Sequence, residues 1–170
     1  MNIVIDGYNF IGRYSGLSGD IESKRDALIN LLSKFRALRG HNITVVFDGW
    51  QNGMPSESSE IIGGVKVIFS RLGEKADDVI KRLSSAKAQN MVVVTSDREI
   101  ISYVTGRGVV AISCGEFEKK LTELSYLEQA GAGDKGDEVY TGRLITTKKK
   151  GNPRRLSKEE RRKKLRMDKM

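Results

Sequence analysis

The sequence predicts an α/β protein, a three-layer α/β/α sandwich built around a mostly parallel sheet. Short apolar, β-prone runs alternate along the chain with segments in which apolar residues recur at helical spacing. Strands separated by helices run mostly parallel, and right-handed crossovers place the helices on the faces of the sheet. A chain of 170 residues is long enough for one domain with a substantial hydrophobic core.

The N-terminal half predicts three strands and two helices. Short apolar runs predict strands at 2–6, 43–48 and near 65–70. Apolar residues spaced three or four positions apart predict two helix faces, marked by Leu28, Leu31, Leu32 and Phe35 and by Val79, Ile80 and Leu83. A polar loop is expected over 50–60, between the second and third strands.

The C-terminal half continues the alternation and then changes character. Continuous apolar runs, typical of strands buried on both faces, occur at 91–95 and 109–112. Helices are expected over 97–106 and along a face marked by Phe117, Leu121 and Leu124. Residues 1–130 therefore form the predicted domain, and 131–170 form an irregular, glycine-containing connection followed by a basic tail.

The positive charge is concentrated in that tail. The chain carries a formal net charge of +8, whereas residues 148–170 hold 12 Lys or Arg and only 3 Asp or Glu. Such a block predicts contact with a polyanion, of which RNA or DNA fits best; an acidic membrane or a merely solvated tail is the alternative. Ser157 and Glu160 have the spacing of a capping box, which predicts a short terminal helix.

Several classes of protein are excluded by composition. The longest apolar runs fall far short of the roughly 20 residues of a membrane span, and no secretory signal opens the chain, so we expect a cytoplasmic protein with no membrane partner. Cys114 is the only cysteine and His41 the only histidine. Disulfide frameworks, Cys/His zinc sites and histidine-based triads are therefore excluded, which leaves carboxylates, hydroxyls, amides, Lys, Arg or a bound metal for chemistry.

Carboxylates gather at one predicted edge of the sheet. Asp6, Asp48 and Asp97 each stand at the end of a strand, and Asp77 and Asp78 open the helix after the third strand. Each could instead serve as a helix cap or dipole partner. Unit charges about 4 Å apart repel by about 4 kcal/mol at an effective dielectric of about 20, so the group as a whole requires a cation. Oxygen-only ligands predict Mg²⁺ or Mn²⁺.

Four short motifs in order resemble one family. They run from Ile5 to Asn9, from Val46 to Gly49, from Phe69 through Ile80, and from Val94 to Glu99. Together with the chain length and basic end they are similar to NYN-domain, PIN-like nucleases, and within these to the bacterial YacP-like group of proposed ribosome-associated endoribonucleases. The resemblance covers residues 2–128.

The resemblance implies specific roles. Asp6, Asp77 or Asp78, and Asp97 would hold the metal, with Asp48 as an outer member and Asn9 positioning the ion or the scissile phosphate. PIN-like relatives that cleave DNA flaps often have Glu two positions before the Asp pair, where this chain has Lys75. This difference argues against a full two-metal arrangement. The predicted RNA-binding residues are Arg71, Lys75 and Arg98 at the rim and Lys148, Lys149, Lys150, Arg154 and Arg155 in the tail, with Tyr8 and Trp50 as candidate base-stacking residues.

The leading functional hypothesis is a metal-dependent endoribonuclease that leaves 5′-phosphate and 3′-hydroxyl ends on mRNA in or near the ribosome. The second is a catalytically weak RNA- or ribosome-binding adaptor on the same fold, in which the carboxylates are structural. The third, a phosphate-transfer domain of the receiver or phosphatase type, requires a lysine near the end of the last strand. The run from Val109 to Cys114 ends without one.

Overall fold

The computed structural model describes residues 1–49, 56–86, 90–131 and 156–170, with side chains in the long helix described as far as residue 123. It confirms the α/β prediction with a sheet of strand order β3-β4-β2-β1-β5-β6. All neighbouring strands are parallel except the antiparallel pair β3–β4. The strands are β1 (Asn2–Asp6), β2 (Asn42–Phe47), β3 (Ser58–Ile62), β4 (Val65–Phe69), β5 (Met91–Val94) and β6 (Val110–Ile112).

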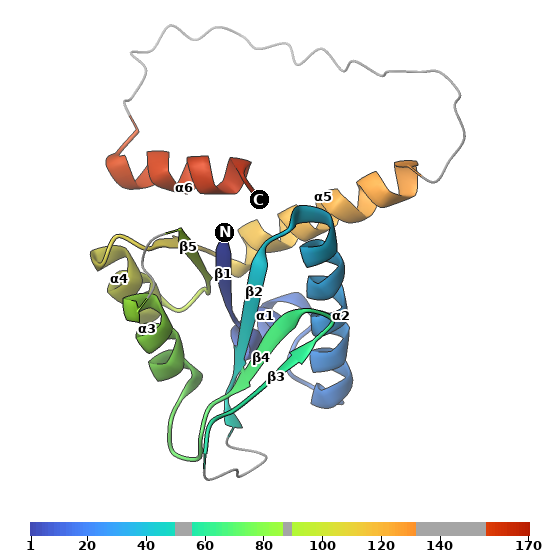
Figure 1. Cartoon of the computed structure of the whole chain (residues 1–170), viewed down its shortest axis with the longest axis vertical. Helices are drawn as coiled ribbons and strands as arrows, with labels where there is room; N and C mark the ends of the chain where they lie inside the picture. The colour runs from blue at the N-terminus through green and yellow to red at the C-terminus, as the bar shows by residue number, and fades with distance from the viewer. Residues whose placement is uncertain (50–55, 87–89, 132–155) are drawn as a thin grey trace, which may run out of the picture.

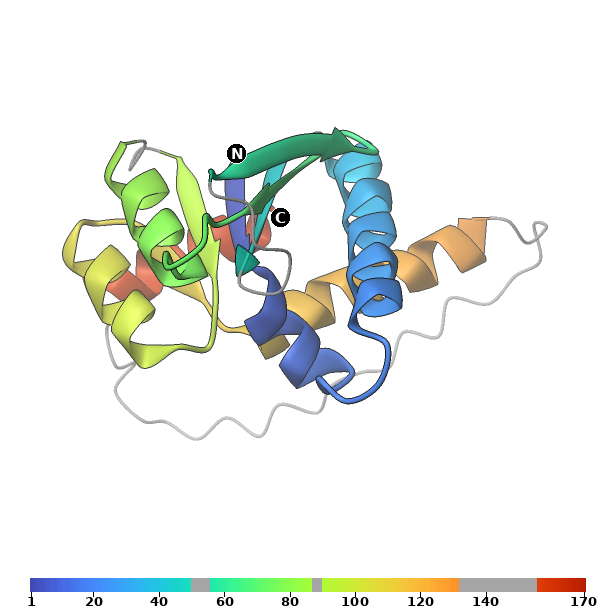
Figure 2. The same cartoon turned by 90° about the horizontal axis from the view of Figure 1, so that it is seen from below.

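Helices cover both faces of the sheet and make the three predicted layers (Figures 1 and 2). One face carries α1 (Gly7–Tyr14), α2 (Ile21–Arg39) and α5 (Cys114–Gly131), and the other carries α3 (Ala76–Ala86) and α4 (Arg98–Gly106). Side chains alternate along each strand, so Ile3 and Ile5 enter the first of two apolar cores and Val4 enters the second. The burial of these strands on both faces explains their continuous apolar sequence.

Two elements depart from the sequence prediction. Strand β3 occupies part of the span expected to be a polar loop, because an edge strand with exposed side chains lacks a regular apolar pattern. Gly63 and Gly64, with φ of 56° and 81°, turn it into β4. The short helix α1 was not expected either, since only Phe10 and Ile11 mark its buried side beyond Gly7. Residues 50–55 and 132–155, with the predicted irregular connection, lie outside the described residues.

Tight packing requires glycine after two of the strand-end aspartates. A Cβ atom on Gly7 would lie 2.2 Å from the Phe47 ring, and one on Gly49 would lie 1.8 Å from the backbone oxygen of Ser70. Both distances are far below contact distance. The two Asp-Gly pairs therefore place a carboxylate at a strand end and allow the next element to pack closely against its neighbour.

The predicted terminal helix is present as α6 (Lys158–Asp168), and Ser157 and Glu160 form the expected capping box. It packs on the body through Met167 and Met170, and Lys163 forms an ion pair of 2.8 Å with Glu116. In Figure 1, α6 lies beside the N-terminus of the chain, at the opposite end of the sheet from the tip of β2. Within the described residues, no helix combines the length and apolarity needed to cross a membrane.

Candidate active site

The carboxyl ends of three neighbouring parallel strands bring the predicted acidic residues together. Strands β2, β1 and β5 are adjacent in the sheet; Asp6 ends β1, Asp48 follows β2, and Asp97 follows β5 after two residues. Asp77 joins them from the first turn of α3. Ligand sites of open α/β sheets lie in this crevice, beyond the carboxyl ends of the strands. We call these four residues the carboxylate cluster.

Asp6 is the most buried member of the cluster, with 7% of its surface exposed. Its carboxylate accepts hydrogen bonds from the Asn9 backbone N–H (3.3 Å) and the Thr95 hydroxyl (3.1 Å). The pKa of Asp6 is raised to about 6, chiefly by burial; the two hydrogen bonds oppose this rise, and the charges of Asp77 and Asp48 add to it. A bound cation would relieve this electrostatic cost.

Asp77 and Asp78 have different surroundings, although they are adjacent in sequence. Asp77 is half-buried, and its pKa is raised first by burial and then by the charge of Asp97, with smaller effects from other carboxylates. Asp78 is exposed, and its charge acts on Lys81. Of the two candidates for a metal ligand, the structure places Asp77 in the carboxylate cluster and Asp78 outside it.

Asp97 is a member of the carboxylate cluster and also caps helix α4. Its Oδ1 accepts hydrogen bonds from the N–H groups of Glu99 (2.7 Å) and Ile100 (3.2 Å), so Asp97 is the N-cap of α4. The Glu99 side chain pairs with Lys81 on α3. Within the described residues, Asp97 Oδ2 makes no hydrogen bond and remains available to a ligand.

Asp48 ties the end of β2 to the start of α3. Its Oδ1 accepts a 2.6 Å hydrogen bond from the backbone N–H of Ala76, the residue before Asp77. This contact satisfies one of the free N–H groups of the helix N-terminus and sets the position of Asp77.

Thr95 was not identified from the sequence as a site residue. It is fully buried, and its hydroxyl donates to Asp6 and accepts a 3.1 Å hydrogen bond from the Asp97 backbone N–H. One hydroxyl group therefore connects two members of the carboxylate cluster. The available signal in the sequence is a hydroxyl residue directly after a buried strand and two residues before an aspartate.

Asn9 positions the turn after β5. Its side-chain oxygen accepts hydrogen bonds from the Ser96 backbone N–H (3.0 Å) and the Cys114 thiol (3.1 Å). These contacts join α1, the turn that carries Asp97, and the start of α5. The Asn9 side-chain nitrogen makes no hydrogen bond to any other described residue.

The predicted RNA-binding and base-stacking residues have different surroundings, and some of them lie outside the described residues. Arg71 pairs with Glu74 at 3.3 Å, whereas Lys75 and Arg98 are exposed, and neither side chain is paired within the described part of the chain. Tyr8 packs 5.0 Å from the Phe47 ring and receives a hydrogen bond from Arg25, so it is a packed aromatic rather than a free platform. Outside the described residues lie Trp50, Lys148, Lys149, Lys150, Arg154 and Arg155.

The donor chemistry of the carboxylate cluster fits a hard divalent cation. All donors are oxygens, and their mutual charge raises the pKa of Asp6 and Asp77. No group of three or more Asp, Glu, His or Cys side chains within the described ranges is already arranged to enclose a metal ion.

An acidic cluster at the carboxyl edge of a Rossmann-like, mostly parallel sheet defines the class of PIN-like nuclease folds. Comparison with known proteins supports this class at the level of the family. The chain matches the model of the YacP-like NYN domain over residues 3–168 and belongs to that family.

Two solved structures are similar to most of the chain. The crystal structure of Rae1 (YacP) from Bacillus subtilis has a TM-score of 0.64 and 26% identity, covering 77% of this chain and 79% of that one. A tryptophan-to-leucine mutant of the same protein has a TM-score of 0.63 and 26% identity, covering 76% of this chain and 79% of that one. No curated protein sequence matched the chain.

Proposed function

We propose that the protein is a metal-dependent endoribonuclease that hydrolyses RNA phosphodiester bonds and leaves 5′-phosphate and 3′-hydroxyl ends. Its proposed substrate is mRNA, cleaved in the cytoplasm in association with the ribosome. The observation that carries the proposal is the carboxylate cluster, in which burial and neighbouring charge raise the pKa of Asp6 to about 6. Membership of the YacP-like NYN domain family supports the nuclease class.

In this proposal Asp6, Asp77 and Asp97 hold Mg²⁺ or Mn²⁺. Such an ion supplies the charge that binds phosphodiester oxygens, lowers the pKa of a water molecule and stabilises an in-line displacement. Asp48 contributes negative charge from the outer side while it holds Ala76. Asn9 keeps the turn bearing Asp97 in place, and its side-chain nitrogen can donate to a phosphate oxygen.

RNA would contact two separate parts of the surface. Arg71, Lys75 and Arg98 come from the loops and helix starts that surround the carboxylate cluster. The exposed cations of α6 lie at the other end of the sheet, where the RNA strand being cleaved need not reach. Folded RNA such as that of the ribosome would offer phosphates to α6 while mRNA occupies the carboxylate cluster.

The direct test is cleavage of a labelled mRNA with Mg²⁺ or Mn²⁺, free and under translation. We expect the Asp97→Asn protein to lose cleavage, because asparagine preserves the helix cap but removes the charge. Asp78→Asn, which removes a neighbouring charge outside the cluster, is the matched control. RNA binding without metal-dependent cleavage in the unaltered protein would favour the adaptor hypothesis.

A further inference from the structure

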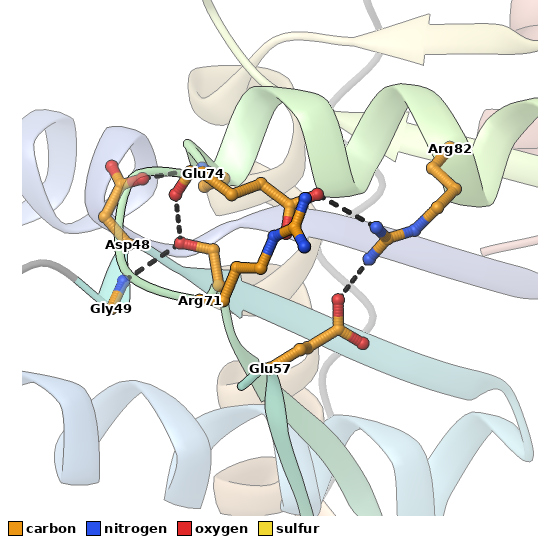
Figure 3. A network of polar contacts seen from close by, with 8 residues as sticks. Asp48, Gly49, Glu57, Arg71, Glu74 and Arg82 are labelled. Carbon is orange, nitrogen blue, oxygen red and sulfur yellow. Dashed lines mark hydrogen bonds and ion pairs between the residues drawn. The ribbon is translucent and has the colours of Figure 1, made fainter. Parts of the chain in front are cut away.

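A second charged group lies beside the carboxylate cluster and is not part of it. Glu74, in the loop between β4 and α3, pairs with Arg71 Nε at 3.3 Å and with Arg82 Nη1 at 2.9 Å. The other terminal nitrogen of Arg82, on α3, pairs with Glu57, the residue before β3 (Figure 3). The four side chains thus connect three segments of the chain.

The exposed fractions show which of these charges faces solvent. The Glu74 side chain is only 11% exposed, whereas those of Arg71 and Arg82 are 62% and 52% exposed. Glu74 therefore acts as an inner anchor that sets the spacing of two guanidinium groups at the surface. Arg71 uses only Nε for this contact, which leaves its two terminal nitrogens without a partner in the described residues.

A surface pocket of about 460 Å³ opens over these side chains and is lined by Ser56, Glu57, Arg71, Glu74 and Arg82. It adjoins the carboxylate cluster through the backbone. The Ser70 hydroxyl donates to the Glu74 carbonyl oxygen (2.6 Å) and accepts from the Gly49 N–H (3.0 Å), next to Asp48. Figure 3 shows this connection from Asp48 to Arg82.

We propose that this arginine pocket binds a backbone phosphate of the RNA substrate, at a nucleotide next to those in the carboxylate cluster. The inference rests on the proposed function and names its substrate contact. The planar fork of Arg71 suits two parallel hydrogen bonds to phosphate oxygens. Glu57 is the carboxylate that competes with a phosphate here, because it is paired with Arg82 and its side chain is 35% exposed. A phosphate that enters the pocket displaces Glu57 and takes its place on Arg82.

The test measures binding of a single-stranded RNA oligonucleotide to full-length Asp97→Asn protein in EDTA, so that cleavage does not interfere. Adding Arg71→Ala or Arg82→Ala should lower affinity about tenfold, as expected for one charged hydrogen-bonded contact. Each should also reduce the slope of log affinity against log salt by about 0.7. Glu57→Gln should raise affinity, because it removes the competing carboxylate.

Arg107→Ala is the matched control, since Arg107 is an exposed arginine stacked on Tyr103 at 3.6 Å and far along α4 from the cluster. Arg107→Ala should leave the RNA affinity and the slope of log affinity against log salt nearly unchanged, because it removes only a charge distant from the pocket. A lowered Tm with unchanged affinity and slope in the Arg71 and Arg82 variants would overturn the proposal and assign the network to stability alone. Unchanged or weaker binding by Glu57→Gln would also overturn it.

The proposed function and the arginine pocket can fail separately. If the unaltered protein does not cleave RNA but the arginine variants still lose affinity and salt slope, the pocket stands and the nuclease assignment falls. If cleavage depends on metal and on Asp97 while the arginine variants bind RNA like their parent, the nuclease assignment stands and the pocket falls.

Discussion

At the scale of single residues, Asp6 is held in the carboxylate cluster at the expense of stability. Its pKa rises from an ordinary value of 3.8 to about 6, a difference that corresponds to about 3 kcal/mol. Between these two values the folded state binds more protons at Asp6 than the unfolded state does. The contribution of Asp6 to the free energy of unfolding therefore falls as pH rises from about 4 to about 6.

Replacing Asp6 by asparagine should remove this dependence. In EDTA, we expect the free energy of unfolding of Asp6→Asn, relative to the unaltered protein, to increase by up to about 3 kcal/mol between pH 4 and pH 7.5. Denaturant unfolding at the two pH values measures the difference. A constant difference between the two proteins across this range would show that Asp6 is not destabilised by burial and by neighbouring carboxylates.

The adjacent residues Asp77 and Asp78 provide a paired test of metal binding. We expect Asp77→Asn to weaken Mn²⁺ affinity by at least about 10-fold, the lower range seen even for supporting partners of a metal site. Asp78→Asn should retain affinity within a few-fold, because its side chain is exposed and lies outside the carboxylate cluster. Titration calorimetry gives both values. Similar small losses in the two variants would indicate that both act only through the helix dipole.

The acidic positions could be predicted because parallel strands end at a common edge. Asp6, Asp48 and Asp97 needed only the strand pattern to be placed together. The choice between Asp77 and Asp78 depends on how α3 is rotated against the sheet, and its buried residues Ala76, Val79 and Ile80 set that rotation. The role of Thr95 depends on two hydrogen bonds to residues brought together by folding, one of them 89 positions away.

At the scale of elements, burial on both faces made the central strands predictable. Strands β1, β2 and β5 read as continuous apolar runs because each contacts helices above and below the sheet. The edge strand β3 has one buried neighbour and mostly exposed side chains, so its backbone pairing with β4 defines it rather than its sequence pattern. The short helix α1 is also hard to predict from the sequence, because only three of its eight residues are buried.

The Asp48-Gly49 turn gives a test at this scale. We expect Gly49→Ala to destabilise the protein by about 1–3 kcal/mol, the usual cost of overpacking, because its Cβ would collide with the Ser70 backbone. Gly106→Ala, in a helix where no atom lies within 4 Å of the added Cβ, should be neutral or slightly stabilising. Thermal unfolding compares the two. Equal effects would show that the turn is not tightly packed.

At the scale of the whole molecule, the basic C-terminal helix lies away from the carboxylate cluster. Its attachment uses Met167 and Met170, whereas Lys158, Arg161 and Lys164 remain exposed. Charge density predicts a polyanion contact for the tail, and the folded structure shows at which end of the sheet the basic helix α6 lies.

Attachment and RNA binding by α6 should be separable by mutation. Met167→Ala should lower the Tm with little change in the salt dependence of RNA binding, because it removes only apolar packing. Replacing Lys158, Arg161 and Lys164 together by Gln should reduce the salt slope of binding to ribosomes by about 2 and leave the Tm unchanged. A lowered Tm with an unchanged slope in the triple variant would make these cations part of the fold only.

The central claim is that the carboxylate cluster cleaves RNA with a divalent cation. Its most direct test is single-turnover cleavage of an end-labelled RNA across a Mg²⁺ titration, comparing the unaltered protein with Asp77→Asn and Asp78→Asn. We predict saturable, Mg²⁺-dependent formation of 5′-phosphate ends, preserved in Asp78→Asn and reduced at least about 100-fold in Asp77→Asn. Cleavage that persists in EDTA, or that survives unchanged in Asp77→Asn, would contradict the account.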